Sequence, residues 1–215
     1  MISTDVRISG IHPPVAAEPA TGADSGLACS PSMFSRVVWI TGLSGAGKST
    51  IGRMLADRLR TSGCPTVLLD GDDVRLAIAD ARVGHDGESR LTNAMRICRL
   101  ARMISSQGLT VVVPTMSMFA EVHAWNRAHQ PNFYQVLIRV PMEVLRRRDA
   151  RGLYSRAERG EARDVVGIHC PFEEPDSPDL VLTNTGPVSE VQRLADEIFT
   201  RLPGPEPSFK PTTTP

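Results

Sequence analysis

The sequence predicts a three-layer α/β domain, in which a parallel sheet of about five strands carries helices on both faces. Several short runs of β-branched and other apolar residues are almost unbroken, which is typical of strands buried on both sides. Helical patterns separate these runs, and strands that alternate with helices form parallel sheets. The length of 215 residues, with 41% hydrophobic and 22% charged residues, suits one such domain with additional terminal segments.

The expected strands and helices follow one another in order along the chain. Strands are expected at 37–40, 66–69, 109–113, 134–140 and 180–182. A helix is expected from Ser49 to Arg60, between the first two strands. A longer helix is expected from about Glu88 to Gln107, where apolar residues recur near one face.

The two ends of the chain differ in composition from this central region. Residues 1–35 are rich in Ala, Ser, Pro and Gly, and residues 203–215 contain five prolines and three consecutive threonines. Neither segment has a sustained helical or strand period, so we expect a disordered N-terminal arm and a disordered C-terminal tail. The folded domain is therefore expected to span residues 36–202.

The charge balance and the lack of long apolar runs argue against several classes of protein. The 24 basic and 24 acidic residues cancel, which disfavours a protein that binds nucleic acid or an anionic membrane through bulk charge. No apolar stretch approaches the roughly 20 residues that cross a bilayer, and the N-terminus does not have the pattern of a secretory signal. The four cysteines are scattered without metal-ligand spacing, so we expect a cytoplasmic protein with reduced thiols.

A glycine-rich segment between the first strand and the first helix has the GxxxxGK[ST] spacing of a phosphate-binding loop, or P-loop. Its glycines let several backbone N–H groups point at phosphate oxygens, and the following helix adds the positive end of its dipole. Lys48 is the only lysine in the expected domain and is placed to reach the β- and γ-phosphates, while the Ser49 hydroxyl is placed for Mg²⁺. The expected nucleotide-binding residues are Gly42, Ser44, Gly45, Ala46, Gly47, Lys48, Ser49 and Thr50.

An acidic cluster, Asp70, Asp72 and Asp73, comes directly after the second strand. Because the carboxyl ends of parallel strands share one edge of a sheet, Asp70 should face the same crevice as the P-loop. Carboxylates there can orient an acceptor hydroxyl and hold Mg²⁺, so Ser49 and Asp70 are the expected metal contacts. Helix capping is the alternative role for Asp72 or Asp73. The sequence has no Asn-Lys-x-Asp element, which disfavours a GTPase.

Together these motifs resemble the adenylylsulfate kinase family. The resemblance is carried by Ile40–Thr50, Leu69–Arg75, Arg90, Asn93, Arg148-Asp149, Gly152–Tyr154, Gly167-Ile168, Pro171–Glu173 and Pro175. These segments follow the family's order and extend over about residues 36–201. The resemblance implies a P-loop kinase that uses Mg²⁺ and transfers the γ-phosphoryl group of ATP to the 3′-hydroxyl of adenylyl sulfate, a step of sulfate assimilation. Family members often form dimers, so it also implies a homodimer as one assembly.

The resemblance also implies roles for single residues of this chain. Ser117 matches a serine traditionally described as a phosphoserine intermediate, although direct transfer needs none, and a loop serine that bonds its neighbours is the alternative. Residues 149–170 match a lid over ATP, with Arg148 and Arg151 as the expected lid arginines. The implied catalytic residues are Lys48, Asp70, Asp72 and Ser117. The implied acceptor contacts are Asp70, Arg75, His85, Arg90, Asn93, Ser117, Val165 and Ile168.

Several acceptor-side positions depart from the family's pattern, whereas the ATP-side elements are intact. Two aromatic residues that sandwich the acceptor's adenine in the family are replaced here by His85 and Val165, so two large π faces are lost. Met118 and Ala120 stand where the family has a proline and a basic residue.

These departures leave two interpretations of the acceptor open. One is an adenylylsulfate kinase with a repacked pocket. The other is a related enzyme that phosphorylates a different nucleotide conjugate or a small hydroxyl acceptor. A non-catalytic nucleotide-binding regulator is disfavoured, because binding alone does not require an acidic acceptor pair.

Overall fold

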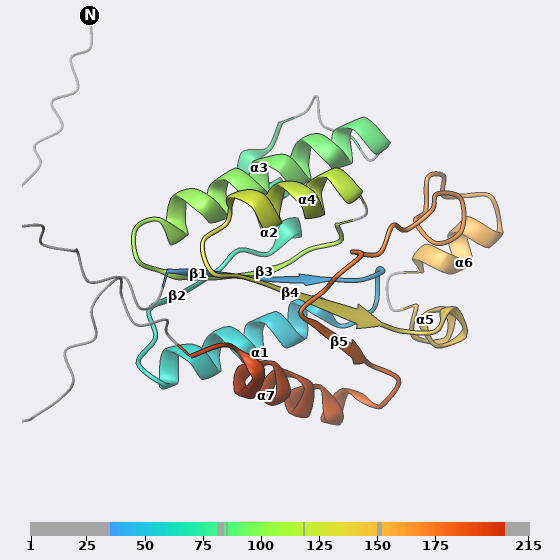
Figure 1. Cartoon of the computed structure of the whole chain (residues 1–215). Helices are drawn as coiled ribbons and strands as arrows, with labels where there is room; N and C mark the ends of the chain where they lie inside the picture. Colours follow the sequence, from blue (N-terminus) through green and yellow to red (C-terminus); the bar gives the residue numbers. More distant parts are fainter. Residues whose placement is uncertain (1–34, 81–83, 85, 118, 150–151, 205–215) are drawn as a thin grey trace, which may run out of the picture.

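Five parallel strands form one sheet in the computed structural model of the chain, in the order β2-β3-β1-β4-β5 (Figure 1). Each predicted strand is confirmed, with its ends shifted by one residue at most. The strands are β1 (Arg36–Thr41), β2 (Thr66–Leu68), β3 (Thr110–Pro114), β4 (Phe133–Arg139) and β5 (Leu180–Thr183).

The structure describes residues 35–80, 84, 86–117, 119–149 and 152–204. The predicted arm up to residue 34, the tail from residue 205, and His85, Met118 and Arg151 lie outside the described residues. Near the two predicted boundaries of the domain, Arg36 Nη2 donates a hydrogen bond to Pro203 O at 2.5 Å. The boundaries of 36–202 stay a prediction.

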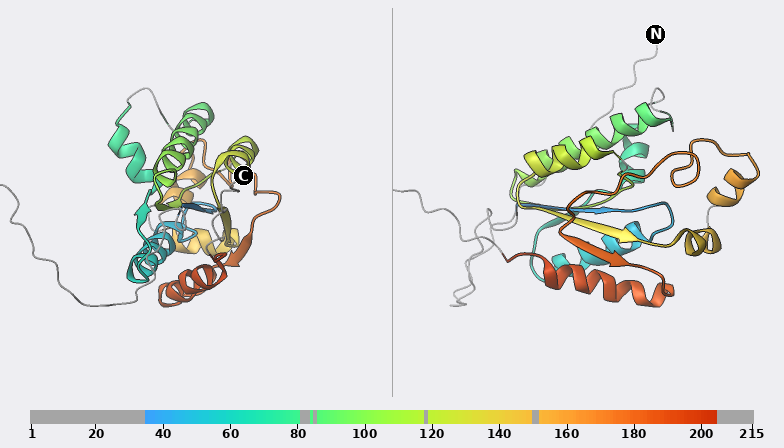
Figure 2. Two further views of the ribbon diagram at one scale, coloured as in Figure 1. Left: turned by 60° about the vertical axis from the view of Figure 1, so that its left-hand side comes forward. Right: turned by 45° about the vertical axis from the view of Figure 1, so that its right-hand side comes forward.

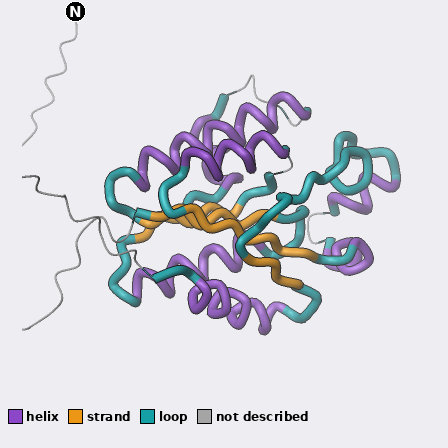
Figure 3. The backbone as a smooth tube through the Cα atoms, in the orientation of Figure 1, coloured by secondary structure: helices purple, strands orange, loops and turns teal. Residues whose placement is uncertain are grey.

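Helices cover both faces of the sheet, as the three-layer prediction requires (Figures 1 and 2). Helices α1 (Lys48–Thr61) and α7 (Val191–Arg201) lie on one face, and α3 (Gly87–Ser105) and α4 (Ala120–His129) lie on the other, together with the shorter α2 (Gly71–Ile78). Helices α5 (Met142–Arg148) and α6 (Leu153–Glu158) lie beyond the carboxyl end of β4, and long loops accompany α6 (Figure 3). None of the helices in the described ranges is long and apolar enough to cross a membrane.

Alternate residues of the central strand β1 pack into two separate cores. Val38 and Ile40 belong to the core formed with α1 and α7, whereas Val37 and Trp39 belong to the core formed with α3. Burial of side chains of this size stabilises the fold by about 1.5–3 kcal/mol each. Because both faces of β1 are covered, neither set of residues can be polar, which explains the unbroken apolar run in the sequence.

The position of β1 between β3 and β4 creates the crevice in which the site lies. Ile40 pairs in register with Pro114 at the carboxyl ends of β1 and β3, and Thr115 N donates to Ile40 O at 3.0 Å. The P-loop follows β1, and Thr115 follows β3, so both enter the same edge of the sheet. Ligands of open parallel sheets bind outside the carboxyl ends of the strands at such a point.

The structure contains helices that the sequence analysis does not assign. Helices α2 and α5 are eight and seven residues long, which is too short for a helical period to stand out. Helix α7 is different, because its buried residues Val191, Leu194, Ala195 and Ile198 follow the helical spacing that a closer inspection of the sequence could have found.

We predict that Gly52→Ala destabilises the fold, because α1 passes closest to the end of β3 at this glycine. A Cβ at Gly52 would lie 2.9 Å from Pro114 Cγ, and the proline ring is held in a buried strand. Overpacking costs about 1–3 kcal/mol, which exceeds the gain of up to about 1 kcal/mol in helix propensity. Urea denaturation measures the difference in the free energy of unfolding.

Gly87→Ala is the matched control, because a Cβ at Gly87, in the first turn of α3, has no neighbour within 4 Å among the described residues. It is expected to keep the wild-type free energy of unfolding or to raise it slightly. Equal effects of the two substitutions would contradict the close approach of α1 to β3.

Candidate functional site

The P-loop joins β1 to α1 in a conformation that glycine makes possible at two places. Gly42 has a φ of 150°, and a Cβ there would lie 2.5 Å from Ile138 O in β4. Gly47 has a φ of 90°, and a Cβ there would lie 2.7 Å from Asn184 Nδ2. Other side chains at these positions would therefore meet both unfavourable backbone angles and filled space.

Three carbonyl groups of the P-loop accept hydrogen bonds from side chains, two from outside the loop and one from Lys48 within it. Tyr154 Oη donates to Ser44 O at 2.8 Å, and Asn184 Nδ2 donates to Ala46 O at 2.9 Å. Lys48 Nζ donates to Leu43 O at 2.8 Å. These bonds fix the orientation of the peptide groups, and a loop held in this way can present its N–H groups to an anion.

The amino end of α1 differs from those of its two neighbours in the site. Asp70 caps α2 and Asp86 caps α3, each by accepting a backbone N–H. Among the described residues, α1 has no side-chain cap and no acidic residue in its first turn. The positive end of its dipole and its first N–H groups therefore face the crevice, which is the arrangement that binds phosphate.

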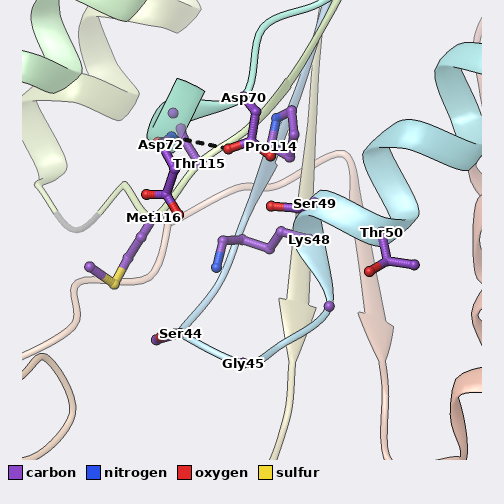
Figure 4. Close-up of a pocket in the computed structure, with 12 residues that line it drawn as sticks. Ser44, Gly45, Lys48, Ser49, Thr50, Asp70, Asp72, Pro114, Thr115 and Met116 are labelled. Carbon is purple, nitrogen blue, oxygen red and sulfur yellow. Dashed lines mark hydrogen bonds between the residues drawn. The ribbon is translucent and has the colours of Figure 1, made fainter. Parts of the chain in front are cut away.

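A pocket of about 300 Å³, which we call the P-loop pocket, lies in front of this helix end (Figure 4). Lys48, Ser49 and Asp72 point into it, while Thr50 lies on the side of α1 away from Asp70 (Figure 4). Its lining residues are Ser44, Gly45, Gly47, Lys48, Ser49, Thr50, Asp70, Gly71, Asp72, Pro114, Thr115 and Met116. The structure thus brings together the predicted phosphate-binding and acidic residues.

Asp70 combines a structural contact with its place in the pocket. Its side chain is 7% exposed, and its Oδ1 accepts the backbone N–H of Asp72 at 3.0 Å, which starts α2. Helix capping, the alternative role considered for Asp72 or Asp73, is therefore performed by Asp70. Since the cap fixes the carboxylate beside Ser49 in the pocket, Asp70 is preorganised for a ligand.

The donor set of the P-loop pocket fits Mg²⁺ shared with a phosphate. Ser49 supplies a hydroxyl, and Asp70 and Asp72 supply carboxylates. No group of three or more His, Cys, Asp or Glu side chains in the described ranges can hold a metal alone. Mg²⁺ in phosphate sites commonly keeps several waters and uses one or two carboxylates with phosphate oxygens, so this sparse set suits it.

A second pocket of about 230 Å³, the α3 pocket, adjoins the first and shares Ser44, Gly71, Asp72, Thr115 and Met116 with it. The predicted acceptor residues Arg75, Arg90 and Asn93 line it. Arg75 Nη1 also donates to Gly84 O at 2.6 Å, which ties α2 to the segment before α3. This pocket is suited to an anionic molecule placed end to end with the nucleotide phosphates.

A third pocket of about 430 Å³, which we call the lid pocket, adjoins the α3 pocket and is lined in part by residues 153–166 of the segment that the sequence predicts to be a lid. Arg90 and Leu153 line both, and Val165 borders the lid pocket although it is only 2% exposed. Arg156 and Arg163 add positive charge to the lining, and Glu161 adds a negative one.

The lid helix α6 is fixed at its start by Asp149. This carboxylate accepts the backbone N–H of Tyr154 at 3.0 Å and of Ser155 at 2.9 Å, and also the Ser155 hydroxyl. The hydrogen bonds from Ser155, and then from Tyr154, lower the pKa of Asp149 to about 2. The carboxylate is therefore ionised, and the start of α6 is held, throughout the neutral pH range.

Some predicted site residues do not line these pockets. Ser117 is 0% exposed, and its hydroxyl makes no hydrogen bond within the described part of the chain, while its backbone N–H and carbonyl both bond Thr41 Oγ1. Arg148 Nη2 donates to Gly186 O at 2.7 Å and lies 3.4 Å from Asn184 Oδ1. Ile168 packs in the apolar core of the lid. Gly42 and Ala46 belong to the P-loop but are buried and line none of these pockets.

Four residues with clear contacts in the site were not among the predicted ones. Thr115, Met116 and Asn184 each follow the carboxyl end of a strand, so the topology of a parallel sheet could have singled them out. Tyr154 lies in the Gly-Leu-Tyr motif of the lid, but nothing in the sequence indicates that its hydroxyl reaches Ser44.

The comparisons with known proteins agree with this geometry. The family model described as adenylylsulphate kinase matches residues 34–183. An adenylyl-sulfate kinase of Picosynechococcus is 38% identical over 165 residues, which cover 77% of this chain and 92% of the relative. A cytidine diphosphoramidate kinase of Campylobacter jejuni is 36% identical over 149 residues, which cover 69% of this chain and 86% of the relative.

Among solved structures, the chain is similar to the APS kinase CysC of Mycobacterium tuberculosis in complex with AMPPNP and APS. The TM-score is 0.70 at 32% sequence identity, and the match covers 77% of this chain and 95% of that one.

We predict that Lys48→Ala weakens nucleotide binding while the fold persists, because the substitution removes the ammonium group beside the P-loop pocket. A charged hydrogen bond to phosphate contributes about 1.5–3 kcal/mol, so the Kd of a non-hydrolysable ATP analogue should rise about 10- to 100-fold. Isothermal titration calorimetry measures the Kd, and circular dichroism reports the fold.

Arg53→Ala is the control, since it removes one positive charge from the exposed side of the same helix. A similar rise in Kd for both variants would indicate a general charge effect and contradict the specific role of Lys48.

Proposed function

The chain belongs to the adenylylsulphate kinase family, and we propose that it transfers the γ-phosphoryl group of ATP to the 3′-hydroxyl of adenylyl sulfate. The family membership makes it an ATP-dependent phosphotransferase that acts on a hydroxyl group. The acceptor, the metal and the roles of single residues are part of the proposal. With this acceptor the reaction is a step of sulfate assimilation.

One observation carries the proposal: the P-loop pocket and the arginine-lined α3 pocket adjoin each other and share five lining residues. Asp72 lines both pockets, so its carboxylate lies where the two substrates would meet. Phosphoryl transfer depends mainly on positioning and on neutralising charge. A donor phosphate in the first pocket and an anionic acceptor in the second would have this arrangement.

Each group in the pockets has a part in this proposal. Lys48 and the amino end of α1 would neutralise charge on the phosphates, and Mg²⁺, held by Ser49 and Asp70 with the phosphates, supplies further positive charge when bound. Asp70 and Asp72 would orient the acceptor hydroxyl and accept its proton. Arg75, Arg90 and Asn93 would hold the anionic part of the acceptor.

The lid residues complete the proposed site. Arg148, and Arg151 outside the described residues, are proposed to contact ATP when it is bound. The contact of Arg148 with Gly186 O places its guanidinium beside the loop after β5. His85, which lies outside the described residues, Val165 and Ile168 are proposed to contribute to the acceptor side. Val165 borders the lid pocket, and Ile168 packs against the apolar cluster that contains Val165.

A second acceptor, cytidine diphosphoramidate, is favoured by the lining of the α3 and lid pockets. Among the described residues that line them, none is aromatic. An adenine gains strongly from two aromatic faces, whereas this lining offers guanidinium and aliphatic groups. The similarity to the Campylobacter enzyme makes a cytidine conjugate the specific alternative.

We predict that the purified protein phosphorylates adenylyl sulfate in an acceptor panel with ATP and Mg²⁺. The panel contains adenylyl sulfate, cytidine diphosphoramidate, AMP and CDP, and measures ADP release together with the mass of the product. Adenylyl sulfate without its 3′-hydroxyl is the matched control and should give no product.

A higher kcat/KM with cytidine diphosphoramidate than with adenylyl sulfate would identify cytidine diphosphoramidate as the acceptor instead. Binding of ATP without phosphorylation of any member of the panel would contradict both acceptors.

We predict that Ser117→Ala retains kcat within about twofold, because the buried hydroxyl makes no hydrogen bond among the described residues and its loss is nearly neutral. Thr41→Val removes the hydroxyl that bonds the backbone N–H and C=O of buried Ser117, and should cost about 1–3 kcal/mol of stability. Steady-state kinetics measures the kcat of the two variants, and thermal unfolding measures their stability. A loss of activity in Ser117→Ala, together with phosphoserine found by mass spectrometry after incubation with ATP, would support the intermediate instead.

A further inference from the structure

Tyr154 joins the lid to the P-loop by a hydrogen bond whose acceptor is a backbone atom. The side chain is 2% exposed, and its Oη donates to Ser44 O at 2.8 Å. The two residues are 110 positions apart in the chain. The bond therefore adds a direct contact between the segments that follow the paired strands β1 and β4.

The ring of Tyr154 is fixed by apolar packing. It belongs to a buried cluster with Leu145, Ala157 and Val165, and Leu43 of the P-loop packs against the same cluster. Burial, and to a smaller extent the negative charge of Asp149, raises the pKa of Tyr154 to about 12. The phenol therefore stays protonated and remains a donor at any pH at which the protein works.

The acceptor of this bond lies where all three pockets meet. Ser44 lines the P-loop pocket, the α3 pocket and the lid pocket. Leu153, the residue before Tyr154, lines the α3 and lid pockets. A shift of α6 away from the P-loop would therefore change the acceptor side and the nucleotide side together.

We propose that Tyr154 is a positioning residue, which holds the lid against the P-loop so that the Ser44 peptide and the wall of the acceptor site keep their places during transfer. The proposal rests on the phosphotransferase function stated above but not on the identity of the acceptor. It assigns to Tyr154 no contact with either substrate.

A lid without this bond should admit water and hold the phosphates less firmly. Loss of one hydrogen bond is expected to lower kcat/KM for ATP roughly three- to tenfold. Because lid closure excludes water from the reaction, the fraction of ATP hydrolysed without phosphorylation of the acceptor should rise. A residue that only stabilises the fold would not change that fraction.

The test compares Tyr154→Phe with Tyr134→Phe. Tyr154→Phe keeps the ring in the lid core and removes only the hydroxyl. Tyr134 is the other tyrosine of the chain and lies in β4, within the core of α1 and α7, so Tyr134→Phe makes the same chemical change away from the lid. The measurements are kcat/KM for ATP, the ratio of ADP to phosphorylated acceptor, and the Kd of a non-hydrolysable ATP analogue.

We expect Tyr154→Phe to lower kcat/KM for ATP and to raise the ratio of ADP to product, whereas Tyr134→Phe behaves as the wild type. Unchanged kcat/KM and an unchanged ratio in folded Tyr154→Phe would overturn the proposal. If the wild type itself phosphorylates no acceptor, the proposed acceptor is wrong. The Kd of the analogue still tests the role of Tyr154 in that case, and an unchanged Kd in Tyr154→Phe would overturn this role.

Asp149→Asn replaces Tyr154→Phe if the latter is not recovered folded. It weakens the start of α6 without touching the phenol, and the same rise in the ratio of ADP to product is expected, whereas an unchanged ratio would overturn the proposal.

Discussion

The site depends on one constraint of the peptide group: a loop that turns its N–H groups toward an anion must turn its carbonyl groups elsewhere. Leu43, Ser44 and Ala46 are buried or half-buried, and a buried carbonyl acceptor needs a donor. In this protein the donors are Lys48 within the loop, Asn184 after β5, and Tyr154 in the lid. The phosphate-binding conformation is thus a property of three segments rather than of the P-loop alone.

Two of these donors, Asn184 and Tyr154, are held in place by different parts of the structure. Asn184 follows directly on β5, and its own N–H bonds Arg139 O at the end of β4, so it moves only with the sheet. Tyr154 lies on a short helix outside the sheet, held by Asp149 and by a small apolar cluster. The P-loop is therefore held on one side by a residue bonded to the sheet and on the other side by a residue of a separate short helix.

The sequence predicts local features well and remote contacts poorly. The strands, α1, α3 and the P-loop arise from patterns within a few residues, namely apolar runs and glycine spacing, and their predicted places are confirmed. The contacts of Tyr154 with Ser44 and of Asn184 with Ala46 join residues 110 and 138 positions apart, and no local pattern encodes them. Asp70 shows a third case, because the acidic cluster is visible in the sequence but the residue that caps α2 is not.

The same difference between local patterns and remote contacts explains why the sequence predicts the acceptor less well than the nucleotide. In the proposed site, backbone groups would hold the donor phosphates, so the glycines and Lys48 form a strict pattern in the sequence. Side chains from α2, α3 and the predicted lid line the pockets proposed for the acceptor, and one of them, Val165, also belongs to the apolar cluster around Tyr154. A change at such a position can reshape the acceptor site without disturbing the sheet, but it acts on the cluster that also holds Tyr154. If the proposed roles hold, acceptor choice and ATP binding are linked through the lid, and a substitution that alters one is expected to alter the other unless the hydrogen bond to Ser44 O is kept.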